Sequence, residues 1–166
     1  MNLESYDNKN FSRGAPALVE ALWLAVSGLL VETWLPGSYW RITILKLFGA
    51  NIGGAVVLKP GIKIKFPWRL QLGSHVWIGE RVWIDNLELV SIGDNTCISQ
   101  GAFICTGSHD FKSPGFDLIT EKIVIGSRVW VGAYSRIFVG ANIPDDIFLK
   151  AGSTVIKEFK ISDKAV

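Results

Sequence analysis

The chain has 166 residues, of which 49% are hydrophobic and 19% charged, and its formal net charge is +2. This length is enough for the core of one domain, and the weak, dispersed positive charge argues against nucleic acid as a partner. The two cysteines, Cys97 and Cys105, lack the spacing of zinc ligands, so we expect neither a metal nor a disulfide framework and predict a reducing, cytoplasmic location.

Residues 1–50 are predicted to form a helical cap. Two apolar stretches, Ala17 to Thr33 and Ser38 to Phe48, are separated by a Pro-Gly break and favour helices. Within these fifty residues, the longest run without a charge, Ala21 to Val31, has eleven residues and is too short to span a membrane. We expect the helices to cover the open end of the structure that follows. A shallow contact with a membrane surface is the alternative, and it is compatible with capping.

From Ile52 onward, an aliphatic residue recurs at every sixth position. Fifteen such positions form five groups of three, and the steps between groups are eight, eight, twenty-one and six residues. If each hexad is a short strand plus a bend, three hexads close one triangular coil, and the coils stack about 4.8 Å apart. The pattern predicts an all-β fold, a parallel β-helix of about five coils over residues 51–160, with a short tail at 161–166. The positions are Ile52, Leu58, Ile64, Leu72, Ile78, Ile84, Ile92, Ile98, Ile104, Ile125, Val131, Ile137, Ile143, Leu149 and Val155.

A second inward position is predicted four residues after each aliphatic residue, and small or β-branched side chains mostly fill it. Trp68, Glu88 and Phe159 depart from this pattern, each in the third hexad of its group. Three residues after the aliphatic position, the sequence favours residues that tolerate positive φ at a bend. These are Gly61, Gly101, Gly107, Gly140, Gly152 and Asn95.

The one long interruption follows Ile104. The next hexad begins only at Ile125, so residues 110–124 are predicted to form a loop at a corner. His109 ends its hexad at that corner, outside the apolar prism, where an imidazole with an intrinsic pKa of about 6.5 suits a general base. The other histidine, His75, also ends a hexad, but no long loop follows it, and we interpret it as an ordinary surface residue.

Four features together resemble the hexapeptide-repeat acyltransferases, in the branch of O-acetyltransferases of colanic acid and other exopolysaccharide biosynthesis. They are the hexads, the TGSHD run at 106–110, the IGSRVWVGA run at 125–133, and Pro67 and Trp68 after LFGANIG at 47–53. The resemblance covers nearly the whole chain. It implies a left-handed β-helix, a homotrimer, and active sites between adjacent subunits that use acetyl-CoA as the acyl donor.

The resemblance also implies roles for single residues. His109 matches the base that deprotonates the acceptor hydroxyl for attack on the thioester carbonyl. Asp85 or Asn86, at the corner one coil earlier, matches a position that binds the acceptor: spacing favours Asp85 and side-chain chemistry favours Asn86. A polar pair beside an inserted corner is also ordinary turn chemistry. Ala133 and Ala151 resemble small positions that line the pantetheine channel, although bends of hexads favour small residues in any case.

Ile156 and Lys157 resemble a pair near the nucleotide end of CoA, where an ammonium group could meet a phosphate. A lysine in this part of the chain can equally be solvated.

The predicted function is acetyl-CoA-dependent O-acetylation of a sugar hydroxyl in a nucleotide-linked or lipid-linked polysaccharide precursor. A sugar amine is the alternative acceptor, and a lipid-linked acceptor would place the protein at the inner face of a membrane. A non-catalytic β-helix, acting as a structural or binding module, leaves His109 and the loop after it unexplained. A β-helix carbonic anhydrase would need three histidines for its metal, and the chain has two.

Overall fold

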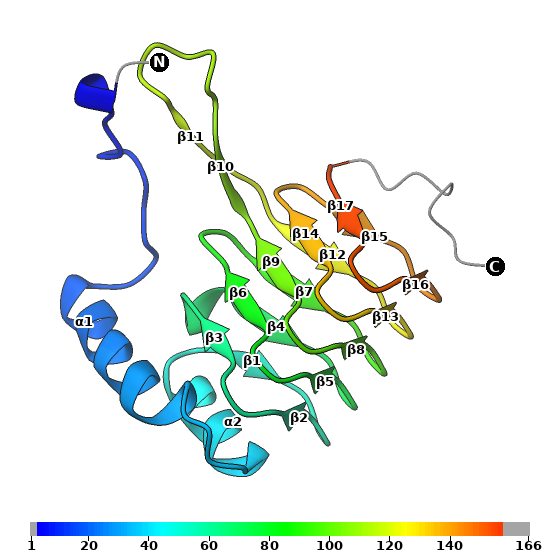
Figure 1. The fold of residues 1–166 in the computed structure, drawn as a ribbon. Coiled ribbons are helices and arrows are strands. Elements are labelled where there is room, and N and C mark those ends of the chain that lie inside the picture. The colour runs from blue at the N-terminus through cyan, green and yellow to red at the C-terminus, as the bar shows by residue number, and fades with distance from the viewer. Residues whose placement is uncertain (1–2, 158–166) are drawn as a thin grey trace.

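The computed structural model describes residues 3–157 and shows a solenoid of parallel strands with helices at one end (Figure 1). A 3-10 helix, η1 (Leu3–Ser5), precedes α1 (Ala17–Val26), which continues as a π-helical segment, η2 (Ser27–Val31), and is followed by α2 (Ser38–Leu47). The predicted end of the solenoid at residue 160, Phe159 and the tail at 161–166 lie outside the described residues.

Three parallel sheets of five strands each form the walls of the solenoid. The first wall contains β1 (Asn51–Ile52), β4 (Leu70–Leu72), β7 (Val90–Ile92), β12 (Ile123–Ile125) and β15 (Asn142–Ile143). The second contains β2 (Val57–Leu58), β5 (Trp77–Ile78), β8 (Cys97–Ile98), β13 (Trp130–Val131) and β16 (Phe148–Leu149). The third contains β3 (Lys63–Ile64), β6 (Trp83–Asp85), β9 (Phe103–Cys105), β14 (Arg136–Phe138) and β17 (Thr154–Val155), and η3 (Pro67–Arg69) joins β3 to β4. The predicted β-helix of five coils is confirmed.

The core runs along the axis of the solenoid. All fifteen aliphatic positions of the hexads are buried, and equivalent residues of successive coils pair directly, as Ile78 does with Ile98. In the third hexads the second inward position is filled by Leu70, Val90 and Ile123, each two residues before the next aliphatic residue. Trp68 and Glu88 therefore do not break the pattern, because the inserted residues precede the inward side chain.

The bends take positive φ whether or not glycine is present. The third residue after the inward aliphatic residue has φ of 74° at Gly61, 55° at Asn95 and 59° at His75. Gly107 does not adopt positive φ, contrary to its predicted role at a bend, because the chain leaves the coil there.

The helices close the first coil. Ser38 Oγ, at the start of α2, accepts a hydrogen bond from the backbone N–H of Leu58 at 3.0 Å and donates one to its carbonyl at 3.2 Å. Trp23 is buried against the core and donates from Nε1 to the carbonyl of Ile64 at 3.1 Å. Arg41, also buried, donates to backbone carbonyls between residues 31 and 37. No helix within residues 3–157 is long and apolar enough to cross a membrane.

A hairpin replaces the predicted corner loop. Between β9 and β12, β10 (Gly107–His109) pairs antiparallel with β11 (Leu118–Thr120), and Figure 1 shows this ribbon projecting from the coils. The excursion starts at Gly107, earlier than the predicted 110–124, and Ile123 already belongs to the first wall. Ser108, predicted to point inward, is exposed, since its strand pairs outside the prism.

Candidate active site

His109 lies in β10, and its side chain is half-buried. Its Nδ1 lies 2.8 Å from the backbone carbonyl oxygen of Phe116. Because a carbonyl oxygen only accepts hydrogen bonds, this contact assigns the ring proton to Nδ1 and leaves the Nε2 lone pair of the neutral imidazole free. The rings of His109 and Phe116 stack, with centroids 4.3 Å apart and an angle of 2° between their planes. The ring of Tyr6 packs edge-on against the imidazole, with centroids 5.4 Å apart. A histidine held in this tautomer can act as a general base.

The turn of the hairpin presents Phe116 to His109. Asp110 and Ser113 are turn-forming residues: the Asp110 carboxylate accepts from the backbone N–H of Lys112 at 2.9 Å, and Ser113 Oγ donates to the Asp117 carboxylate. Phe116 has a φ of 52°, a conformation uncommon for a residue other than glycine. In this backbone conformation, both the carbonyl and the ring of Phe116 contact the imidazole of His109.

A hollow of about 300 Å³ adjoins His109. The segment before α1 forms one side of it, which the sequence did not suggest, since residues 1–50 were predicted to cap the first coil, with contact to a membrane surface as the alternative. The side chain of Trp68 holds this segment in place by donating from Nε1 to the carbonyl of Arg13 at 2.8 Å. The lining residues are Tyr6, Asn8, Phe11, Arg13, Lys65, Phe66, Leu87, His109 and Leu118.

Asp85 and Asn86 lie on opposite sides of the chain. Asn86 is fully buried: its Oδ1 accepts from the backbone N–H of Phe66 at 2.9 Å, and its Nδ2 donates to the carbonyls of Phe66 and Arg69. Asp85 is half-buried, and its carboxylate lies 3.1 Å from the ammonium of Lys65, which lines the hollow. Of the two predicted residues, only Asp85 has a side chain that a ligand in the hollow could approach.

The thiol of Cys105 lies next to this site but is not set up as a nucleophile. Its Sγ donates to the carbonyl of Gly107 at 3.2 Å and lies 3.8 Å from the Asp85 carboxylate. Burial raises the pKa of Cys105 above its ordinary value, which favours the neutral thiol. Residues 3–157 contain no group of three or more His, Cys, Asp or Glu side chains that could hold a metal ion.

Ala133 and Ala151 lie one above the other at the corner that follows the second wall. The carbonyl of Ala133 accepts from the backbone N–H of Gly152 at 2.8 Å, and neighbouring Gly132 lies so close to Ala151 that a Cβ would clash. Gln100 occupies the same corner one coil below, because its carbonyl accepts from Tyr134 at 3.0 Å. On the two upper coils, Ala133 and Ala151 therefore form a column of small side chains that a narrow chain could follow.

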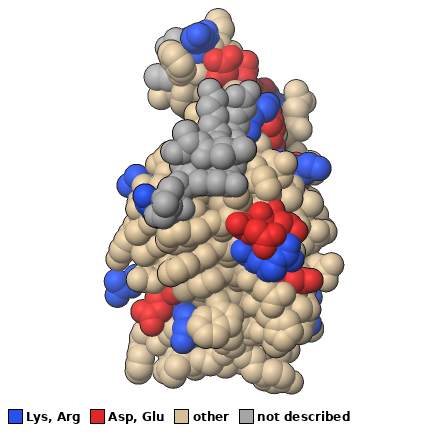
Figure 2. All heavy atoms as spheres, turned by 90° about the vertical axis from the view of Figure 1, so that its right-hand side faces the viewer, with Lys and Arg blue, Asp and Glu red and all other residues tan. Residues whose placement is uncertain are grey.

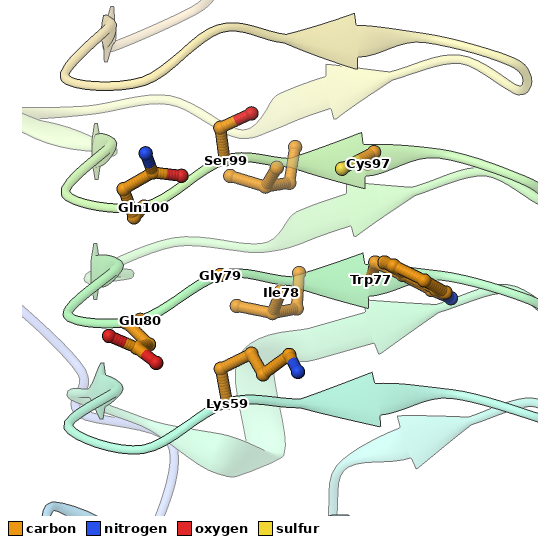
Figure 3. Close-up of a pocket in the computed structure, with 9 residues that line it drawn as sticks. Lys59, Trp77, Ile78, Gly79, Glu80, Cys97, Ser99 and Gln100 are labelled. Carbon is orange, nitrogen blue, oxygen red and sulfur yellow. The ribbon is translucent and has the colours of Figure 1, made fainter.

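This column leads down to a second hollow of about 410 Å³ (Figure 3). In Figure 3 the side chains of Glu80 and Gln100 stand at the corner on successive coils, while Trp77 lies on β5. The lining residues are Lys59, Trp77, Ile78, Gly79, Glu80, Cys97, Ile98, Ser99 and Gln100.

Ile156 and Lys157 follow β17 at the corner between the third and first walls. Ile156 is exposed, and the ammonium of Lys157 lies 2.7 Å from the carboxylate of Glu121, between β11 and β12. The side chains of Lys157 and Glu121 are 69% and 41% exposed, so the pair adds little stability and leaves Lys157 able to exchange partners.

The predicted site residues fall at two corners of the same chain. Asp85 ends β6 of the third wall, and His109 and Lys157 come after strands of that wall. Ala133 and Ala151 come after strands of the second wall. The width of the third wall separates the two groups, so a single chain does not bring the histidine and the alanine column together.

Two solved acetyltransferase structures have a similar fold. A maltose O-acetyltransferase from Clostridium difficile aligns with a TM-score of 0.77 at 20% identity, over 87% of this chain and 81% of that chain. A hexapeptide-repeat acetyltransferase from Vibrio cholerae, complexed with acetyl-CoA, aligns at 0.74 with 24% identity, over 86% of this chain and 80% of that one. These likenesses show the fold, a β-solenoid like that of both acetyltransferases.

Sequence comparison narrows the assignment. No protein-family model matches the chain. The putative colanic acid biosynthesis acetyltransferase WcaF of Escherichia coli is 39% identical over 147 residues, which cover 87% of this chain and 80% of WcaF. The galactoside O-acetyltransferase of Escherichia coli is 26% identical over 122 residues, 71% of this chain and 60% of that protein. The chain belongs to the hexapeptide-repeat acetyltransferases, in the group that contains WcaF.

Proposed function

We propose that this protein transfers the acetyl group of acetyl-CoA to a sugar hydroxyl of a polysaccharide precursor, with His109 as the general base. The observation that carries the proposal is the hydrogen bond from Nδ1 to the Phe116 carbonyl, which leaves Nε2 as the proton acceptor. The adjoining hollow has the aromatic rings of Tyr6, Phe11 and Phe66 in its lining, and such rings suit the apolar face of a pyranose.

The chemistry follows from this geometry. Nε2 of His109 takes the proton of the acceptor hydroxyl as the oxygen attacks the thioester carbonyl, and the C–O bond forms. The tetrahedral adduct then collapses, the C–S bond breaks, and the thiolate of CoA receives the proton from the imidazolium. The products are the O-acetyl sugar and free CoA, and the imidazole is neutral again.

The column at Ala133 and Ala151 fits the pantetheine arm of the donor. Side chains no larger than a methyl group leave the backbone of this corner accessible. The ammonium of Lys157, in the upper coils, would bind a phosphate at the nucleotide end of CoA. Acetyl-CoA is present in the related Vibrio cholerae structure and CoA in the structure of a galactoside acetyltransferase. We propose the same donor here.

A homotrimer would join the two corners. We propose that His109 of one subunit faces the alanine column of the next, because one chain keeps them apart. The outward residues of the second wall support lateral packing: they are apolar from coil to coil, whereas those of the first wall are mostly polar. On the face shown in Figure 2, charges are few and stand in small groups. The second-wall column is Val57, Trp77, Cys97, Trp130 and Phe148; the first-wall column is Asn51, Gln71, Ser91, Val124 and Asn142.

The deciding experiment incubates the purified chain with acetyl-CoA and candidate sugars, follows thiol release, and identifies products by mass spectrometry. Acetyl esters on hydroxyl acceptors would support the proposal. Acetamides formed only on amino sugars would make the protein an N-acetyltransferase. No release with either class, together with a measured absence of acetyl-CoA binding, would favour a non-catalytic β-helix.

The acceptor and the location belong to the same proposal. We propose a lipid-linked sugar as acceptor and a cytoplasmic enzyme that works at the inner face of a membrane. Exposed apolar residues in the helical cap support this choice over a nucleotide-linked sugar. Comparing turnover on a lipid-linked sugar with that on the matching nucleotide sugar tests it, and faster turnover of the nucleotide sugar would reverse the choice.

A further inference from the structure

Helix α1 is apolar on both of its faces. Trp23 on α1, and Ser27 and Val31 on its continuation η2, point inward and are buried, as expected for a cap. The outward face carries Leu18 and Leu22 on α1 and Leu29 on η2, which are 80%, 55% and 75% exposed. A surface helix normally places polar or charged residues outward, so this outward face lacks the composition that water favours.

The exposed apolar residues are concentrated in the cap. Nine of the eighteen large apolar side chains exposed in the described residues lie between residues 18 and 47. We call this set the apolar cap face: Leu18, Leu22, Leu24, Leu29, Leu30, Trp34, Leu35, Tyr39 and Leu47. Exposed apolar residues gathered in this way mark contact sites with proteins or membranes.

The charges around the apolar cap face favour a membrane over a protein as its partner. Its segment contains two acidic residues, and both are compensated: Glu20 pairs with Arg13, and Glu32 accepts from Ser27 and lies 3.9 Å from the ammonium of Lys63. Lys46 in the same segment is exposed. Apolar side chains with an exposed lysine and compensated carboxylates complement a surface of anionic lipid headgroups.

We infer that the apolar cap face rests on the surface of an anionic lipid bilayer. The ten residues of α1 and the five of η2 are fewer than the roughly 20 needed to span the hydrocarbon, so the helix lies in the plane of the interface. Trp34 and Tyr39, 81% and 85% exposed, are of the residue types that favour this depth. The inference rests on the proposed function only where it assigns a lipid-linked acceptor.

Trimerisation would multiply the contact. Figure 1 shows the helices at the first-coil end of the solenoid, away from β15 to β17. In a trimer whose threefold axis runs along the solenoids, all three caps face the same side, so three weak contacts act together. The same arrangement would bring the active sites to a fixed height above the membrane, where a lipid-linked sugar is displayed.

The test is flotation of the full chain with vesicles of phosphatidylcholine alone and of phosphatidylcholine with one quarter phosphatidylglycerol. The test variant replaces Leu18, Leu22 and Leu29 by asparagine, which removes apolar surface without changing the charge. The matched control replaces Leu3 and Phe111, 61% and 68% exposed and outside the apolar cap face, by asparagine. Light scattering gives the oligomeric state of each protein, and thiol release with a water-soluble acceptor gives its activity.

We expect the wild type and the control to float with the anionic vesicles, and the partition of the triple variant to fall at least about tenfold while its oligomeric state and its activity on the soluble acceptor persist. Failure of the wild type to float, or equal flotation of the triple variant, would overturn the inference. Loss of the trimer in the triple variant would assign the face to a second copy of the chain instead. Flotation needs no turnover, so an inactive but membrane-bound protein would refute only the proposed function.

Discussion

Phe116 contacts the imidazole of His109 in two ways, through a carbonyl 2.8 Å from Nδ1 and through a ring stacked 4.3 Å from the imidazole centroid. The first contact sets the tautomer, and the second fixes the plane of the ring. One residue of the hairpin turn thus determines both which nitrogen of the imidazole holds the proton and where the lone pair of the other nitrogen points.

Replacement of His109 by alanine is expected to lower turnover by roughly 10² to 10⁴, because the acceptor hydroxyl then lacks a positioned base. Acetyl-CoA affinity and thermal stability should change little, since the side chain is half-buried and lies outside the core. Steady-state kinetics and calorimetry check both parts. His75→Ala, at an exposed bend, is the control and should leave turnover unchanged. Full activity of the His109 variant would remove it as the base.

Phe116→Asn is expected to lower kcat by about tenfold or more with little effect on acetyl-CoA affinity. Asparagine tolerates the positive φ of this position and keeps the carbonyl, so the variant removes the stacked ring alone. Phe116→Tyr keeps the ring and should restore kcat. Equal rates for the asparagine and tyrosine variants would show that stacking has no part in positioning His109.

Ala151→Trp is expected to weaken acetyl-CoA binding by about tenfold or more while the melting temperature stays near that of the wild type. The side chain is exposed at the corner, so a large ring there would block the column without entering the core. Isothermal calorimetry measures the affinity, and Ala151→Ser is the matched control. Unchanged affinity in the tryptophan variant would place the donor elsewhere.

Asn86→Ala and Asp85→Asn should separate structure from binding. Loss of the buried amide leaves backbone groups of Phe66 and Arg69 without partners, so we expect the free energy of unfolding to fall by about 1–3 kcal/mol for each group. Asp85→Asn should cost at most about 1 kcal/mol, since its pair with Lys65 is partly exposed, yet raise the acceptor KM. Chemical denaturation measures the stability of each variant, and steady-state kinetics measures its acceptor KM. A raised KM for Asn86→Ala with unchanged stability, and a loss of stability for Asp85→Asn, would make Asn86 the binding residue and Asp85 the structural one.

The period of six predicted the coils because burial of the aliphatic residues alone produces that period. Each inward residue packs on its equivalent one coil away. The pattern gave no signal where the chain leaves the coil. Ser108 has the small side chain expected for an inward position, yet it lies in the hairpin. Pairing of Gly107 with Thr120 decides this, and such long-range pairing leaves no mark on the period of six.

The site was only partly predictable for a similar reason. His109 was identified by the interruption that follows it. Tyr6 and Phe11 reach the same hollow from the other end of the chain, and nothing periodic links them to it; two aromatic residues in a polar segment were the only signal. Asn86 was favoured for its side-chain chemistry, but its amide forms hydrogen bonds with backbone groups of the residues inserted after Lys65. The sequence does not indicate that these groups need a partner.

The hairpin leaves and rejoins the solenoid at nearly one point, for the backbone N–H of Glu121 donates to the carbonyl of Thr106 at 3.2 Å. Its strands β10 and β11 pair only with each other and add nothing to the three walls. Lengthening or recoding the segment between these two residues would therefore leave the coils undisturbed, at a small entropic cost of loop closure. The coils and the hairpin can therefore vary independently, so the residues around His109 could be exchanged without refolding the solenoid.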